Sequence, residues 1–179
     1  EVKVCKRCVI SNQRPRISFD AEGVCSACRY AEIKQSGIDW KKRDDELAAL
    51  CDKYRRSDGR FDVIVPSSGG KDSGYTAHVL KNRFGMHPLT VTWAPHWYSD
   101  IGRRNFESLV HAGLDNICFT PNGEVHRVMT RLALINLGDP FQPFIYGQKN
   151  FPLKMAVMHD VPLVMVGENG EVQYGGDMK

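Results

Sequence analysis

The stretch Phe61–Ser73 reads FDVIVPSSGGKDS, and it decides the expected fold. A short apolar run leads directly into a glycine-rich turn, and a helix-like segment follows that turn. In such a unit, backbone N–H groups and the N-terminus of the helix converge on one point and favour an anion. The stretch therefore predicts an anion site, for which phosphate is the simplest ligand.

This loop differs from the phosphate loop of kinases and GTPases. A Walker A loop needs Gly-x4-Gly-Lys-Ser/Thr, but Val65 stands where its first glycine would be and Asp72 where its hydroxyl residue would be. Residues 68–73 (SGGKDS) resemble instead the PP-loop of ATP pyrophosphatases, which split ATP between the α- and β-phosphates and adenylylate an oxygen of the substrate. The alternative is a solvated turn of small residues, but six matched positions between a strand and a helix favour the PP-loop.

The resemblance implies roles for individual residues of the loop. Gly69 and Gly70 would let the backbone approach the pyrophosphate without an intervening Cβ. Lys71 would supply positive charge, and Asp72 would orient the loop or help to hold Mg²⁺, so these two are the expected catalytic residues. The expected ATP-binding residues are Pro66, Ser67, Ser68, Gly69, Gly70, Lys71, Asp72, Ser73, Thr92, Gly147 and Gln148.

Strands and helices are expected to alternate after residue 60. The expected strands are 61–66, 88–93, 116–119, 144–147 and 162–166, and the expected helices are 73–84, 101–112, one capped by Asn122, and 151–159. Gly85 and Gly113 would end the first two of these helices. This alternation predicts an α/β fold with a doubly wound parallel sheet, whose ligands lie at the carboxyl ends of its strands.

Residues near those strand ends are further candidates. Thr92 and Trp93 end the second expected strand, where an adenine would lie in such a sheet, although packing explains Trp93 equally well. The aromatic loop 96–98 could stack on a sugar or a base, or could anchor itself by its own aromatic side chains.

Two later segments, 146–148 and 167–169, also follow expected strands, so their polar groups would face the nucleotide or the acceptor. The expected substrate contacts are Trp97, Glu168 and Asn169.

Four cysteines form a second pattern. Cys5-x2-Cys8 and Cys25-x2-Cys28 are separated by sixteen residues, which is the spacing of a tetrahedral zinc site. Two disulfides or an iron–sulfur cluster on the same thiolates are the alternatives. No apolar signal segment precedes Cys5, and a nucleotide-dependent enzyme is expected in the cytoplasm, where disulfides are rare. We therefore expect zinc in a structural role, because four cysteines leave no open coordination position.

The other two cysteines and the histidines are expected to serve packing or the surface. Cys51 shares a helical stripe with Leu47 and Tyr54 in an expected helix over 41–56. Cys118 lies in a strand-like run, and core packing is the expected role, although some PP-loop enzymes use a cysteine for sulfur transfer. The six histidines show no metal-ligand spacing.

Composition is that of an ordinary globular protein. Of 179 residues 42% are hydrophobic and 25% charged, and no apolar run approaches the length of a membrane span, so no membrane contact is expected. Residues 1–60 hold 14 Lys and Arg against 10 Asp and Glu, a surplus of +4 that is too small to indicate nucleic-acid binding. We expect a four-cysteine zinc module over 1–40, a connecting helix and hinge over 41–60, and a PP-loop ATP-binding domain over 61–179.

Several stretches together resemble the bacterial N-acetyl sugar amidotransferases of lipopolysaccharide and nonulosonic-acid biosynthesis. These stretches are 5–9 (CKRCV), 17–20 (ISFD), 23–28 (GVCSAC), 38–40 (IDW), 67–73 (SSGGKDS), 100–102 (DIG) with Asn105, 167–170 (GENG) and 174–176 (YGG).

That resemblance implies that the PP-loop domain continues beyond this chain, and it also implies an activity. Such enzymes convert the acetamido group of a sugar, often nucleotide-linked, into an acetamidino group. ATP and Mg²⁺ would activate the amide oxygen by adenylylation, and ammonia from a separate glutaminase subunit would then displace AMP. Cys51 and Cys118 show no evident histidine partner, so the chain offers no glutaminase cysteine of its own.

Two other functions remain open at this point. Certain tRNA-thiolating enzymes also join an N-terminal zinc module to a PP-loop domain, although sulfur transfer commonly needs catalytic cysteines and only Cys118 is available. A non-catalytic ATP-binding module is the third possibility.

Overall fold

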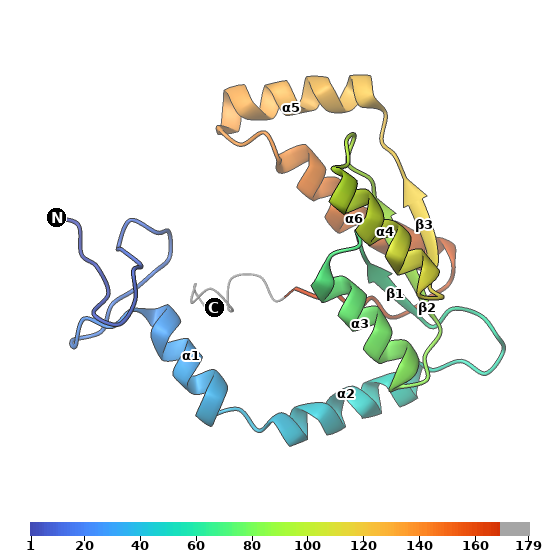
Figure 1. Ribbon diagram of the computed structural model, residues 1–179, viewed down its shortest axis with the longest axis horizontal. Coiled ribbons are helices and arrows are strands. Elements are labelled where there is room, and N and C mark those ends of the chain that lie inside the picture. Colours follow the sequence, from blue (N-terminus) through green and yellow to red (C-terminus); the bar gives the residue numbers. More distant parts are fainter. Residues whose placement is uncertain (169–179) are drawn as a thin grey trace. The chain divides into compact units, whose positions relative to one another are not determined.

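The computed structural model describes residues 1–168 of a mixed α/β protein (Figure 1). Two compact units are present: a smaller one that includes Glu1–Glu46, and a larger one, Leu47–Gly167. The smaller unit contains α1 (Ser26–Ser36) and the start of α2 (Trp40–Tyr54). The larger unit contains the rest of α2, then β1 (Val63–Pro66), α3 (Lys71–Asn82), β2 (Pro88–Trp93), α4 (Asp100–His111), β3 (Asp115–Phe119), α5 (Gly123–Leu137) and α6 (Gln142–Met158). Among these helices, none has both the length and the apolar character needed to cross a membrane.

The sheet of the larger unit is parallel. Its order is β1-β2-β3, and the register pairs Thr90 of β2 with Val65 on one side and Asn116 on the other. On the free side of β1, Ile64 forms a parallel bridge with Val164, and the Ile64 N–H donates to the Leu163 carbonyl at 2.9 Å. Part of the expected strand 162–166 is therefore present as a bridge. The strand β1 therefore has β2 on one side and the single bridge to Val164 on the other.

One face of the sheet packs against three helices. Val63 and Val65 point to this face and form a buried cluster with Cys51 of α2, Leu80 of α3 and Leu109 of α4. Cys51 is fully buried, which confirms its expected place on the apolar stripe of a helix.

The opposite face packs against α6. Ile64 points there and clusters with Leu89 and Val91 of β2 and with Phe151 and Met155 of α6. Successive residues of β1 thus serve opposite faces, as a strand requires. Figure 1 shows helices on both sides of the sheet.

Several expected elements lie where the sequence places them. The expected strand 88–93 is β2, and the expected helices 73–84 and 101–112 agree with α3 and α4 within two residues at each end. Gly85 and Gly113 have φ angles of +61° and +79°, in the left-handed region that glycine favours after a helix. The Asn122 carboxamide oxygen accepts hydrogen bonds from the backbone N–H groups of Glu124 and Val125 at 3.0 and 3.1 Å, so it caps α5 as expected.

One expectation is wrong. The expected strand 144–147 and helix 151–159 are a single helix, α6, which begins with Pro143 in its first turn and passes through Pro152. Gly147 and Pro152 predict breaks locally, but Phe151, Met155 and Ala156 bury their side chains against the sheet along one face of this helix. That burial outweighs the helix-breaking tendency of Gly147 and the one hydrogen bond that Pro152 cannot donate.

Candidate functional site

The glycine-rich loop joins the carboxyl end of β1 to the first turn of α3. Gly69 has a φ of +84°, and a Cβ built on it would lie 2.6 Å from the Phe106 nitrogen and 2.8 Å from the Asn105 carbonyl carbon. Only glycine fits there, because the conformation is left-handed and the space is taken by the backbone of α4. Gly70 is the N-cap residue of α3, with φ −70° and ψ 153°.

Hydroxyl groups hold the two ends of the loop together. Ser67 Oγ and Ser73 Oγ are 3.0 Å apart, and Ser73 Oγ also donates to the Gly70 carbonyl at 3.2 Å. The Ser67 N–H donates to the Val91 carbonyl of β2 at 2.9 Å. Ser68 is exposed, so its hydroxyl is open to a ligand.

Thr92 of β2 is hydrogen-bonded to the start of the loop. Its Oγ1 donates to the Ser67 carbonyl at 2.5 Å, and the residue is 1% exposed. Asn116 Nδ2 donates to both Thr92 Oγ1 and Thr90 Oγ1, at 3.0 and 2.9 Å. The Thr92 hydroxyl is therefore used to position the loop. Asn116 belongs to the same support and is missed by sequence reasoning, because only the register of β2 and β3 shows it.

Lys71 and Asp72 lie in the first turn of α3. Lys71 Nζ is 2.7 Å from Asp72 Oδ1, with the side chains 87% and 57% exposed. An ion pair so exposed is weakly held, so both side chains can turn toward a ligand. The turn thus combines the N-terminus of a twelve-residue helix, an ammonium group and a carboxylate at the carboxyl end of the parallel strand β1.

The chain beyond the Val164 bridge returns to the same turn. A Cβ on Gly167 would lie 3.0 Å from the Asp72 carbonyl and from the Ser73 nitrogen, so this backbone packs against the start of α3. The expected substrate residue Glu168 is exposed, and Asn169, like 170 and 174–176, lies outside the described residues.

The aromatic loop after β2 is anchored by two of its three rings. Tyr98 packs against Phe106 with ring centroids 6.3 Å apart, and His96 meets His126 at 4.8 Å. Trp97 is 88% exposed.

The remaining expected ATP contacts lie in α6. Gln148 is exposed, while Gly147 faces the indole of Trp93 so closely that a Cβ would overlap it. Trp93 also stacks on Phe119 at 5.1 Å and meets Phe151 at 5.8 Å, so its ring is part of the packing on this face of the sheet.

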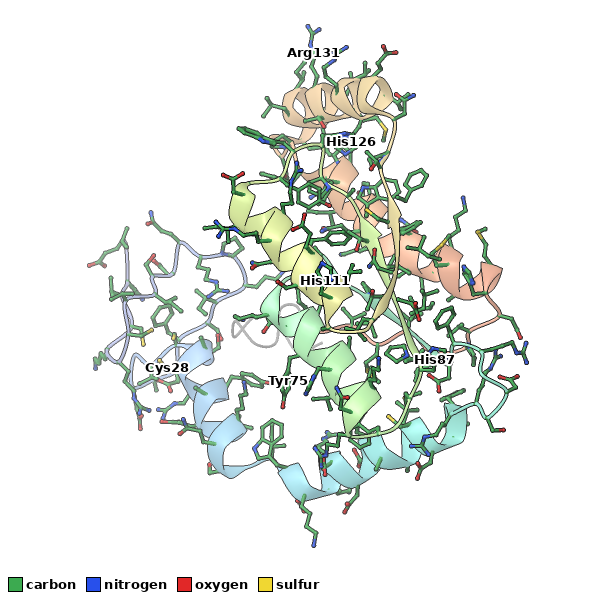
Figure 2. All side chains as sticks on the ribbon, turned by 45° about the vertical axis from the view of Figure 1, so that its right-hand side comes forward. Cys28, Tyr75, His87, His111, His126 and Arg131 are labelled. Carbon is green, nitrogen blue, oxygen red and sulfur yellow. The ribbon has the colours of Figure 1, made fainter. Side chains whose placement is uncertain are left out.

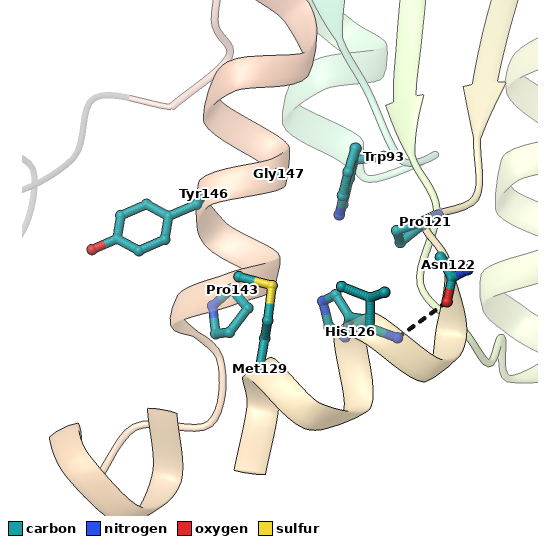
Figure 3. Close-up of a pocket in the computed structure, with 9 residues that line it drawn as sticks. Trp93, Pro121, Asn122, His126, Met129, Pro143, Tyr146 and Gly147 are labelled. Atoms are coloured by element: carbon teal, nitrogen blue, oxygen red, sulfur yellow. Dashed lines mark hydrogen bonds between the residues drawn. The ribbon is translucent and has the colours of Figure 1, made fainter. Parts of the chain in front are cut away.

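A cavity of about 370 Å³ opens beside Trp93 (Figure 3). Its walls come from the end of β2, from the loop after β3 and from the N-terminal halves of α5 and α6. Among the lining residues are Trp93, His126, Met129, Pro143, Tyr146 and Gly147.

The four cysteines of the smaller unit come together. The sulfur atoms of Cys5, Cys8, Cys25 and Cys28 all lie within 4.8 Å of one another, and all are free thiols. Cys8 Sγ is 3.6 Å from Cys25 Sγ, and Cys5 Sγ is 4.0 Å from Cys28 Sγ. Tetrahedral zinc with Zn–S bonds of about 2.3 Å needs sulfurs about 3.8 Å apart. The cluster could therefore hold a metal ion such as zinc. Figure 2 shows Cys28 at the start of α1.

Backbone N–H groups stabilise the thiolate form of Cys5, which is the form that binds a metal ion. The N–H groups of Arg7 and Cys25 each lie 3.3 Å from Cys5 Sγ. Burial raises the pKa of Cys5, but donation by Arg7, Cys25 and Cys8 outweighs it and brings the pKa down to about 6. Interaction with Cys8 and burial raise the pKa of Cys28 to about 12. Packed thiols cannot all ionise without a positive ion among them.

The turn before Cys25 is held by one carboxylate. Asp20 Oδ1 accepts from the N–H groups of Glu22 and Val24, each at 2.9 Å, and Asp20 Oδ2 accepts from Arg29 Nε at 2.7 Å. This fixes the second cysteine knuckle relative to α1, which begins directly after Cys25.

The expected core role of Cys118 is wrong. Cys118 is exposed, because β3 is the last strand on its side of the described sheet. Partial burial of the thiol nevertheless raises its pKa, so it is protonated at neutral pH.

No protein-family model matches the chain. A segment of 88 residues, 49% of this chain, is 25% identical to an uncharacterized protein of Methanocaldococcus jannaschii. The match covers 31% of that protein's own length.

Proposed function

We propose that this chain is the ATP-binding part of a PP-loop ATP pyrophosphatase with a doubly wound sheet. The observation that carries the proposal is the backbone of residues 67–70, which turns at the carboxyl end of β1 into the N-terminus of α3, with β2 on one side of β1 and the Val164 bridge on the other. Ligands of open α/β sheets bind where strand succession reverses.

Residues of this loop have the chemistry that pyrophosphate release requires. Backbone N–H groups at the start of α3 would bind the pyrophosphate, and Lys71 would offset the charge that develops on it. Mg²⁺ is usually held by one or two carboxylates together with phosphate oxygens, and the exposed carboxylate of Asp72 suits that role. The hydrogen bond from Thr92 Oγ1 to the Ser67 carbonyl would hold the loop in its observed conformation.

The acceptor proposed is the acetamido group of a nucleotide-linked sugar, which would become an acetamidino group. This part rests on the sequence resemblance to N-acetyl sugar amidotransferases. Adenylylation would turn the amide oxygen into a leaving group, and ammonia from a separate glutaminase subunit would replace it. The cluster of four cysteines would hold structural zinc.

Turnover assays test both parts. The full-length gene product is incubated with ATP, Mg²⁺ and ammonium, with and without a panel of nucleotide-linked N-acetyl sugars, while AMP, pyrophosphate and acceptor mass are followed. Acceptor-dependent AMP with oxygen replaced by NH supports the amidotransferase. Asp72→Asn should abolish pyrophosphate release, whereas Glu124→Gln, which changes the acidic residue in the first turn of α5, should retain it.

A second candidate is tRNA thiolation, which one observation favours. Cys118 is an exposed thiol near the carboxyl end of β3, on the strand next to β2. Its raised pKa opposes the candidate, because sulfur transfer uses the thiolate. AMP release that depends on unmodified tRNA, and not on any sugar, would move the assignment to this function.

A further inference from the structure

The cavity between α5 and α6 contains two buried nitrogen atoms without partners. Within residues 1–168, three buried side-chain polar atoms have no hydrogen-bond partner: Trp93 Nε1, Tyr98 Oη and His126 Nε2. Two of the three, Trp93 Nε1 and His126 Nε2, belong to residues that line this cavity. Buried polar atoms are nearly always hydrogen-bonded, so this coincidence indicates an absent partner.

The two nitrogens differ in what they can bind. The indole N–H of Trp93 only donates, and Figure 3 shows the nitrogen-bearing end of this ring directed toward the cavity above α5. His126 Nδ1 is 3.3 Å from Thr130 Oγ1, so either tautomer is compatible and Nε2 can donate or accept. A ligand must therefore present an acceptor to Trp93 and a second polar atom to His126.

Charge further restricts the ligand. Burial first, and then the neighbouring His96, lower the pKa of His126, so its imidazole is neutral at pH 7. The other residues that line the cavity are apolar or uncharged, among them Met129, Pro143 and Tyr146. Such walls would leave an ionic ligand without a counter-charge. A mostly apolar cavity with a few directed polar groups is typical of small-molecule sites.

We propose that this cavity binds an uncharged polar group that accepts a hydrogen bond from Trp93 Nε1 and forms a second hydrogen bond with His126 Nε2. A carboxamide and the edge of a nucleobase share this chemistry. The cavity lies at the end of β2 and beside the loop after β3, beyond the same edge of the parallel sheet as the glycine-rich loop. An adenine is expected at the end of β2, so the nucleobase arm rests on the proposed function, whereas the N-methylacetamide arm is defined without ATP and is independent of turnover.

The indole N–H signals of the tryptophans provide a direct test. The chain has three tryptophans, and their ¹H–¹⁵N indole signals can be assigned with Trp93→Phe and Trp97→Phe. N-methylacetamide is titrated as the carboxamide probe, uridine and adenosine as nucleobase probes, and acetate as the charged counterpart of the amide. We expect a saturable shift of the Trp93 signal with a neutral probe, and no comparable shift with acetate or in the exposed Trp97 signal.

The responses to the different probes also distinguish the two classes of ligand. A shift with N-methylacetamide alone assigns a carboxamide, and a tighter response to a nucleoside assigns a base. His126→Phe, which keeps a ring but removes both nitrogens, should weaken the response at least several-fold while the spectrum stays that of a folded protein. A Trp93 signal that no neutral probe moves, or that acetate moves equally, overturns the proposal. So does an unchanged response in a folded His126→Phe protein.

Discussion

Gly69 and Phe106 meet backbone to backbone, so that a Cβ on Gly69 would come within 2.6 Å of the Phe106 nitrogen. This contact packs the glycine-rich loop after β1 against α4, the helix after β2. The conformation of the loop therefore depends on the position of α4 in the folded larger unit.

Gly69→Ala should therefore destabilise the larger unit. A left-handed φ costs an ordinary residue about 1–3 kcal/mol, and the overlap with α4 adds to that. Gly70→Ala is the matched control, because φ is −70° there and the nearest atom to a new Cβ is 3.9 Å away, so only the weaker N-cap preference of alanine counts, at about 0.5–1 kcal/mol. Urea unfolding measures both, and equal losses would contradict the assigned geometry.

Thr92→Val should lower stability and loosen the loop together. It keeps the shape of the side chain but leaves the Ser67 carbonyl and the Asn116 amide short of a partner, at a cost of about 1–3 kcal/mol. Thr76→Val is the comparison, because that hydroxyl bonds only a carbonyl of its own helix. Chemical denaturation gives the stability change, and ATP titration shows whether affinity falls with it. Thr92→Val as stable as Thr76→Val would show that the buried network contributes little.

Removal of metal should unfold the cysteine cluster. Four thiols packed within 4.8 Å repel one another once ionised, and structural zinc binding is coupled to folding. Cys8→Ser should reduce bound zinc, measured by elemental analysis, together with the melting temperature of residues 1–46. Cys118→Ala should keep the full metal content. Metal that persists in Cys8→Ser would disprove this ligand set, and visible absorption with bound iron would assign an iron–sulfur cluster instead.

His126 gives the larger unit a pH dependence of known sign. Its pKa in the folded state is below the ordinary value of 6.5, first because of burial and then because of His96. The folded state therefore binds fewer protons than the unfolded state in this window, so the contribution is present above pH 6.5 and is lost as the pH falls through the folded pKa. His126→Asn should flatten this part of the curve in urea unfolding between about pH 5 and pH 8. Parallel curves for the two proteins would show that the imidazole is not buried.

Cys118→Ala distinguishes the two candidate functions. The thiol is exposed but protonated at neutral pH, so its removal should leave acceptor-dependent AMP release within about twofold of the original rate. Loss of a tRNA-dependent activity in the same variant would instead identify Cys118 as a sulfur carrier.

Much of the fold could be predicted because local signals and packing agree. Alternating apolar runs, the cap at Asn122 and the left-handed glycines Gly85 and Gly113 are short-range features that a sequence shows directly. The cysteine cluster could be predicted for the same reason, since two short spacings bring each pair together within a turn.

The features that could not be predicted depend on contacts between residues that are far apart in the sequence. Gly147 predicts a break, yet its missing side chain lets α6 lie against Trp93 and continue. Cys118 has the pattern of a core strand but lies at an open side of the sheet. Asn116 joins the support of the loop only because the register places it opposite Thr90. None of these features can be predicted from the residues adjacent in the sequence.

The bridge between Ile64 and Val164 also has a consequence for synthesis. These residues are separated by most of the larger unit, so β1 gains its second neighbour only after the intervening strands and helices have been made. Contacts of such long sequence separation form late and slow folding. Gly167, which packs against the first turn of α3, arrives with the same segment. A nascent chain that already displays the glycine-rich motif thus lacks one wall of the site until the ribosome has passed residue 167.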